Sequence, residues 1–137
     1  MFTSRNKKFA GVVLALVTSL GFAAPAMANN HADTSWSFTL TPWNNLGKTG
    51  ARSKTDTSSV YARVNWRSNT GPVWAWAEAG NSANVGTAVV PIWSGQSVKI
   101  SQYIYEWGYR SARLCISDAN GDSATVRVTG VWSPDSV

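Results

Sequence analysis

Two glutamates in this 137-residue chain are candidates for acid–base catalysis. Glu78 and Glu106 are the only glutamates, and both lie in short runs rich in aromatic residues. A pair of carboxylates on either side of a sugar bond is what glycoside hydrolysis requires. No spacing in the sequence brings these two residues together. Hydrolysis is therefore the third of the functions considered below, after two that need no catalysis. Glu→Gln variants would test it.

Other catalytic and metal-binding groups are scarce. His31 is the only histidine and lies in a short polar segment, whereas a Ser-His-Asp or Cys-His centre needs an imidazole fixed by the scaffold. Metal sites built from His and Cys clusters are excluded for the same reason. The run from Asp118 to Asp122 has the composition of a calcium loop, but its glycine comes too early and the closing glutamate is missing, so we interpret it as a tight turn. The sequence predicts no catalytic residue, no metal site and no cofactor.

Aromatic residues offer a binding chemistry instead. Trp74 and Trp76 share one face of a predicted strand with Glu78. Flat rings can stack on the apolar faces of sugars while neighbouring polar groups bind the hydroxyls. Three further rings form a second stripe: Tyr103, Tyr105 and Trp107. Which face of each strand is buried stays open, and we expect most of the eight tryptophans to pack in the core.

Four arginines form a second set of candidate contacts. Each alternates with the apolar residues of its predicted strand, so we expect it to point away from the core. Outward arginines also keep strands soluble and discourage edge pairing, which is the simpler interpretation. The four residues are Arg63, Arg67, Arg113 and Arg127. Cys115 falls on the same face as Arg113; it is either an exposed thiol or, as we expect, a small buried hydrophobic residue.

The elements that position these side chains are predicted to be strands. Alternation with a period of two is typical of half-buried strands. It covers residues 60–67, 112–117 and 125–132, with shorter candidates at 36–41, 73–78, 87–92, 97–101 and 103–107. Seven or eight short strands without helical periodicity predict an all-β fold, a single antiparallel β-sandwich or a small barrel.

Two connections stand out. Asn120-Gly121 between two alternating runs predicts a hairpin. Residues 44–59 (NNLGKTGARSKTDTSS) are almost devoid of apolar side chains and predict a long surface loop. Long loops in compact domains are often functional, although a simple solvated connection is the plainer interpretation.

The first 28 residues predict export. Arg5, Lys7 and Lys8 precede an apolar run at 9–22, and a small-x-small pattern ends at Ala28. These are the parts of a secretory signal peptide, which we expect to be cleaved after Ala28 to leave a secreted domain at 29–137. The apolar run is too short to span a membrane comfortably, and no transmembrane segment is expected in the mature chain.

Charge and cysteine content narrow the function further. Without the three basic residues of the leader, nine Lys and Arg face seven Asp and Glu, a net charge of +2. That is too weak for a nucleic-acid-binding surface but compatible with mild affinity for anionic envelope polymers.

One cysteine cannot form an internal disulfide, so we expect buried tryptophans, at roughly 150–250 Å² each, to stabilise the domain instead.

Three stretches resemble a known group of proteins. The leader, residues 52–61 (RSKTDTSSVY) and residues 130–136 (GVWSPDS) are similar to small secreted proteins of Gram-positive bacteria whose function is unknown. That resemblance implies export and an all-β body but no activity. A fainter similarity, in the Lys-, Thr- and Ser-rich segment before a strand, is to the lactococcin 972-like bacteriocins. It implies a small β-sandwich without disulfides that acts on a cell-wall precursor, and it assigns no functional residue.

We therefore expect a secreted, non-enzymatic β-sandwich that binds an envelope component (a cell-wall polymer or glycan) or a surface protein. The candidate contacts are Trp74 and Trp76 with the four arginines. The alternative is a bacteriocin-like antimicrobial protein. The ligand and the oligomeric state do not follow from the sequence.

Overall fold

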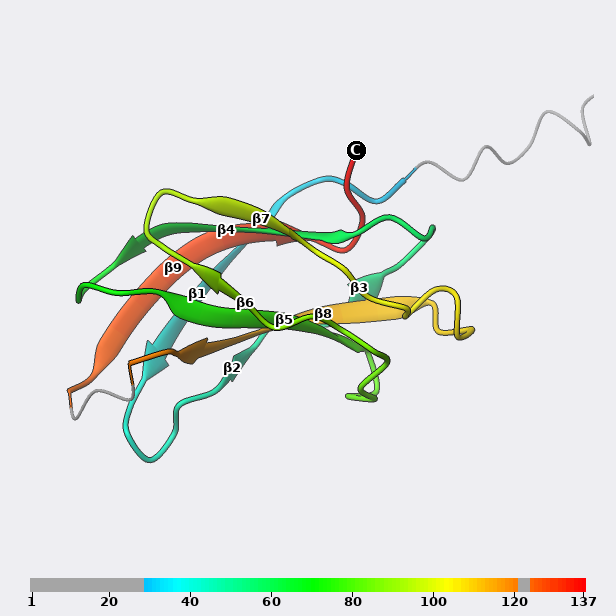
Figure 1. Ribbon diagram of the computed structural model, residues 1–137. Coiled ribbons are helices and arrows are strands. Elements are labelled where there is room, and N and C mark those ends of the chain that lie inside the picture. Colours follow the sequence, from blue (N-terminus) through cyan, green and yellow to red (C-terminus); the bar gives the residue numbers. More distant parts are fainter. Residues whose placement is uncertain (1–28, 121–123) are drawn as a thin grey trace, which may run out of the picture.

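The chain folds into two antiparallel sheets that face each other, as Figure 1 shows. The structure is a computed structural model that describes residues 29–120 and 124–137; the predicted leader and the Gly121 position of the predicted hairpin lie outside these ranges. Within them every regular element is a strand, and no helix is long and apolar enough to cross a membrane. The nine strands of the described residues are β1 (Thr34–Leu40), β2 (Gly47–Lys48), β3 (Arg52–Ser53), β4 (Val60–Arg67), β5 (Val73–Ala79), β6 (Val90–Ile92), β7 (Ser97–Ile100), β8 (Ser111–Asp118) and β9 (Val126–Ser133).

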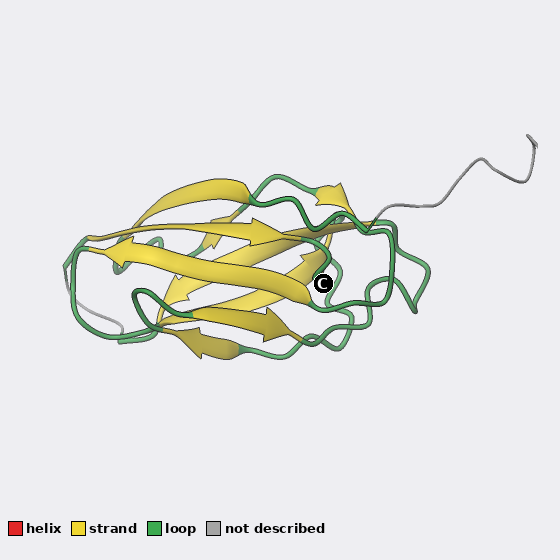
Figure 2. Ribbon diagram, turned by 90° about the horizontal axis from the view of Figure 1, so that it is seen from above, coloured by secondary structure: helices red, strands yellow, loops and turns green. Residues whose placement is uncertain are grey.

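The strand order confirms the predicted β-sandwich and excludes the small barrel. One sheet has the order β1-β9-β4-β7, and the other has the order β2-β8-β5-β6, with β3 also pairing with β8. Figure 2 shows the strands of both sheets running along the length of the molecule. The long strands β4, β5, β8 and β9 are those with the strongest alternation in the sequence, because a strand covered on one side needs one apolar and one polar face.

The core is aliphatic, which corrects the expectation that buried tryptophans hold the domain together. Among the eight tryptophans only Trp36 and Trp132 are buried, and the inner face of β5 consists of valine and alanines. One of the two buried rings faces a glycine. A Cβ on Gly130 would lie 2.4 Å from the Trp36 ring, so this glycine makes the space for that indole.

Strand β4 contains a bulge that reverses its expected faces. Val64 pairs with Gly130 and Trp66 with Thr129, so Asn65 is an extra residue in the register. One extra residue moves the following side chains to the other face of the sheet. Trp66 is consequently 52% exposed instead of inward, and Arg67 is buried instead of outward.

The predicted surface loop at 44–59 is wrong in its central part, because β2 and β3 pair with β8 and Lys54 is buried. Lys54 Nζ lies 2.5 Å from Asp135 Oδ1, with both side chains fully inaccessible, and also donates to the Ser58 carbonyl at 2.6 Å. The two sequence stretches 52–61 and 130–136 therefore meet in one buried ion pair.

The carboxylate of Asp135 is satisfied on both oxygens. Its Oδ2 accepts hydrogen bonds from the Asn30 amide, the Thr55 amide and the Thr55 hydroxyl. Burial alone raises the pKa of Asp135, but the hydrogen bonds from Lys54, Thr55 and the two amides outweigh it and lower the pKa to about 2. This cluster fixes residue 30, the segment before β4 and the end of the chain to one another.

The predicted strand at 103–107 is a turn. The Trp107 amide donates to the Tyr103 carbonyl four residues back, as in a single helical turn, and the Tyr109 amide donates to the Ile104 carbonyl five residues back, as at the end of a helix. Ile104 is buried, whereas the rings of Tyr103 and Trp107 stack on each other at 6.4 Å and remain exposed. Gly108, at a φ of 92°, follows the turn in a conformation that few other residues adopt. The second aromatic stripe therefore does not lie on a sheet.

Candidate functional site

The two tryptophans of β5 lie on the outer face of the five-stranded sheet. Val73 and the three alanines of this strand are fully buried, so the alternate residues point to solvent. Trp74 is 39% exposed, Trp76 is half-buried, and Glu78 follows on the same face. The inner side must be the one with alanines, because the other would bury a carboxylate in the core. This settles which face of the strand is covered.

Neighbouring strands extend this surface on both sides. Trp74 is paired with Pro91 of β6 and with Ser117 of β8, and directly opposed residues of antiparallel strands share a face. Trp76 is paired with Cys115 of β8, which in turn is paired with Lys48 of β2. We call this surface the tryptophan face; its members are Trp74, Trp76, Glu78, Pro91, Ser117, Cys115, Arg113 and Lys48.

An ion pair lies beside the rings. Lys48 Nζ is 2.9 Å from Glu78 Oε2, and both side chains keep some exposure to solvent. Burial raises the pKa of Glu78, but the hydrogen bond and charge of Lys48, with hydrogen bonds from Trp76 and Cys115, lower it below its usual value. Glu78 is thus held as an anion and hydrogen-bond acceptor, the state of the nucleophile or base of a glycosidase rather than of its acid.

Cys115 is buried, as expected, beneath the charged groups of the face. Burial first, and the negative charge of Glu78 second, raise the pKa of its thiol to about 12. A thiol with such a pKa is neither a nucleophile nor a thiolate ligand at neutral pH. Its place on the face is therefore structural.

Arg113 is the one candidate arginine on the tryptophan face. It is half-buried, stands opposite Glu78 in the register, and donates a hydrogen bond from Nη2 to the Gly80 carbonyl. Its Nε is buried without a hydrogen-bond partner among the described residues. The guanidinium is thus held at the edge of the face beside a fixed carboxylate.

The other three arginines lie elsewhere, so the predicted arginine-bearing face is not one surface. Arg63 and Arg127 belong to β4 and β9 of the four-stranded sheet, where Arg63 Nε donates to Asn65 Oδ1 and Arg127 is exposed. Arg67 is inside the sandwich, where its Nη1 donates to the Pro72 carbonyl at 2.7 Å. Its Nη2 lies 3.1 Å from Asp118 Oδ1, so Arg67 joins the two sheets and the expectation that it points outward is wrong.

Lys48 is the member of the face that sequence reasoning missed. It lies in the stretch expected to be a surface loop, and no alternation surrounds it, because β2 is only two residues long. The sequence contains one signal that the face extends beyond β5. Pro91 and Trp93 are two residues apart, so in an extended strand they lie on the same side. Trp93 is half exposed and borders a depression of about 360 Å³ together with residues of the β4–β5 connection.

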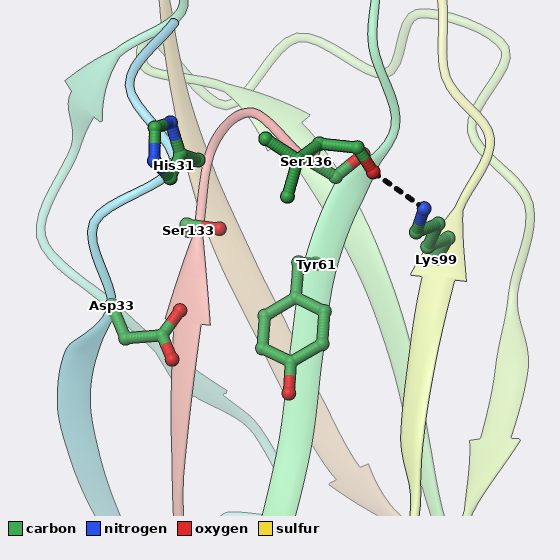
Figure 3. Close-up of a pocket in the computed structure, with 7 residues that line it drawn as sticks. His31, Asp33, Tyr61, Lys99, Ser133 and Ser136 are labelled. Carbon is green, nitrogen blue, oxygen red and sulfur yellow. Dashed lines mark hydrogen bonds between the residues drawn. The ribbon is translucent and has the colours of Figure 1, made fainter.

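A separate pocket of about 330 Å³ lies at the opposite sheet, where the N-terminal segment crosses the end of β9 (Figure 3). Tyr61 and Lys99 project from β4 and β7, and His31 and Asp33 come from the segment that precedes β1. Within residues 29–120 and 124–137 no three His, Cys, Asp or Glu side chains gather as a metal site. Glu106, the other carboxylate considered for hydrolysis, is exposed in the turn at 104–108.

Comparison with known proteins gives one finding. A family model described as "Protein of unknown function (DUF2712)" matches residues 24–136, a range that spans every strand from β1 to β9. No curated protein and no solved structure matches the chain.

Proposed function

We propose that this chain, which belongs to the family described as Protein of unknown function (DUF2712), is an exported binding module whose tryptophan face holds a glycan of the cell envelope. The sequence-based expectation of an uncharacterised family is confirmed to that extent. The observation that carries the proposal is the pair Trp74 and Trp76, which lie on the outer face of one strand, one exposed and one half-buried, beside the Lys48–Glu78 ion pair.

The chemistry of this surface suits a sugar. The exposed side of an indole ring binds the C–H-rich face of a pyranose through dispersion and apolar burial. Glu78 accepts and Lys48 donates hydrogen bonds at fixed positions, which is how a flat site selects among hydroxyl patterns. Trp74 and Trp76 are two residues apart on one strand, so they present rings along a line, as an extended polymer requires.

The charge of the face favours an uncharged glycan over an anionic polymer. Glu78 offsets one of the two basic groups, Lys48 and Arg113, so only about one net positive charge remains on the face. We therefore expect binding that changes little with salt. A strong loss of binding in salt would instead indicate an anionic polymer bound through scattered basic residues.

The test compares the two tryptophans of β5 with one exposed tryptophan of the other sheet. Exported protein is co-sedimented with purified cell walls at low and high salt, with W74A, W76A and the double variant. The control is W66A, because Trp66 is 52% exposed on the outer face of the other sheet. We expect the β5 variants to lose binding and W66A to retain it. Equal loss in all variants, or binding no better than that of an unrelated secreted domain, would contradict the proposal.

The other expected functions can be tested with the same exported protein. The faint similarity to lactococcin 972-like bacteriocins predicts killing of neighbouring cells, which a spot-on-lawn assay with exported protein detects. A surface-protein partner predicts that protease treatment of the walls abolishes binding, whereas digestion of the glycan leaves it intact. Either result would replace the glycan as ligand.

A further inference from the structure

The segment Asn29-Asn30-His31 is held in a folded-back shape at one end of the sandwich. Asn29 Nδ2 donates to Asp56 Oδ2 at 2.7 Å and to the Ser136 carbonyl at 2.9 Å, and the Asn30 amide donates to Asp135 Oδ2. His31 is exposed, and its Nδ1 lies 3.1 Å from both the carbonyl oxygen and Oδ1 of Asn29. The imidazole nitrogen is therefore already turned back toward residue 29.

Cleavage after Ala28 would place a free α-amine on Asn29 and make His31 the third residue of the mature chain. We propose that this terminus is a copper(II)-binding site. Its ligands are the α-amine of Asn29, the backbone nitrogens of Asn30 and His31, and Nδ1 of His31. Such a planar set of nitrogen donors is the arrangement that Cu²⁺, and less strongly Ni²⁺, prefers. The inference rests on the export and cleavage in the proposed function and does not depend on the tryptophan face.

This site needs no cluster of metal-binding side chains, because three of its four ligands are backbone or terminal nitrogens. Only one histidine is needed, provided that it is the third residue from a free amine. In the folded chain His31 Nδ1 lies 3.1 Å from two oxygens of Asn29, so the ring has to turn from these oxygens to the backbone nitrogens when the ion binds. Figure 3 shows the His31 ring on the N-terminal segment, apart from Tyr61 and Lys99, so a metal can reach it from solvent.

Metal binding competes with one contact of the fold. The ion replaces the amide protons of Asn30 and His31 and the extra proton of the terminal ammonium, and all of these protons pass to the buffer without any change in oxidation state. The Asn30 amide then no longer donates to Asp135, whose carboxylate keeps Lys54 and Thr55. Copper thus removes this one backbone contact, while the buried ion pair and the side-chain hydrogen bonds of Asn29 and Asn30 do not involve its ligands.

The test uses the full chain expressed in a secreting host and purified from the medium. N-terminal sequencing establishes the first residue, and titration with Cu²⁺ is followed by visible absorption and electron paramagnetic resonance. We expect Asn29 as the first residue and one Cu²⁺ per chain with the spectrum of a square-planar nitrogen complex. A different first residue would overturn both the cleavage and the copper site. Asn29 as the first residue without that spectrum would overturn the copper site alone.

Two variants separate this site from adventitious copper. H31A removes the imidazole, and a single glycine inserted between Asn29 and Asn30 keeps every side chain but makes the histidine the fourth residue. We expect both to lose the planar nitrogen spectrum and to bind Cu²⁺ at least tenfold more weakly. An unchanged spectrum in the insertion variant would show that other groups hold the ion and would overturn the proposal.

Thermal unfolding gives a readout that does not depend on spectra. The unfolded chain presents the same three residues without the competing bond from Asn30 to Asp135, so it binds Cu²⁺ more tightly than the folded chain. Copper therefore lowers the Tm of the exported protein, and H31A removes this effect. A copper-induced rise in Tm that survives in H31A would indicate a site built from folded side chains elsewhere.

Discussion

The buried ion pair between Lys54 and Asp135 gives the sharpest prediction about stability. In the substitution Lys54→Met the unbranched stem keeps its place, but the ammonium group is removed from Asp135 Oδ1 and from the Ser58 carbonyl. Asp135 then remains charged and buried, with hydrogen bonds only from the amides of Asn30 and Thr55 and from the Thr55 hydroxyl. The largest expected cost of the variant is that of leaving the buried Asp135 carboxylate without its counter-ion.

The expected loss is about 3–5 kcal/mol, the range measured when one partner of a buried pair is removed. Both side chains are fully inaccessible, so solvent screening does not reduce this value. Domains of this size have a free energy of unfolding of about 5–15 kcal/mol, so the variant loses a large fraction of it. The corresponding fall in Tm is about 10 °C or more.

Urea unfolding at neutral pH, followed by tryptophan fluorescence, measures this loss. The control is K99M, because Lys99 is exposed and its Nζ donates only to the carbonyl of Val137. We expect K99M to differ from the wild type by less than about 0.5 kcal/mol. If K54M were as stable as K99M, the buried pair would not hold the stretches 52–61 and 130–136 together, and this reasoning would be refuted.

Three further predictions follow from single groups. Because the pKa of Asp135 is lowered to about 2 from an ordinary 3.8, its contribution to stability is present above pH 4 and is lost as the pH falls toward 2; a urea midpoint that stays constant over that range would contradict this. Cys115, with a pKa raised to about 12, is expected to resist alkylation at pH 8 until the protein is unfolded, and rapid labelling of the native protein would show the thiol to be accessible. A Cβ on Gly47 would lie 2.4 Å from the Phe38 ring, so G47A costs about 1–3 kcal/mol in urea unfolding, whereas G50A, with open space around it, serves as the control.

The strands were predictable where one face is aliphatic and the other polar. Val60, Ala62 and Val64 gave the correct inward face of β4, and β5, β8 and β9 were located to within two residues of their observed ends. The number and spacing of these strands predicted a sandwich or a small barrel, and the strand pairing shows two sheets. Short strands such as β2 and β3 were not predictable, because two paired residues leave no alternation to detect.

Two of the errors share a physical cause, a contact with a residue distant in sequence. The bulge at Asn65, which turns Trp66 outward and Arg67 inward, exists only in the register with β9. Lys54 appears as a typical surface lysine until Asp135, 81 positions away, supplies its counter-ion. Alternation likewise assigns Trp74 to one face of its strand, but only the pairing of the sheets shows that this face is open.

The most direct test of the central claim is the affinity of exported W74A for purified cell-wall glycan, measured by titration beside W66A. Removing a tryptophan at the centre of a binding surface costs about 2 kcal/mol or more, so we expect at least a roughly 30-fold weaker Kd for W74A. W66A should bind as the wild type does. Equal affinities for the two variants would contradict the assignment of the tryptophan face as the binding site.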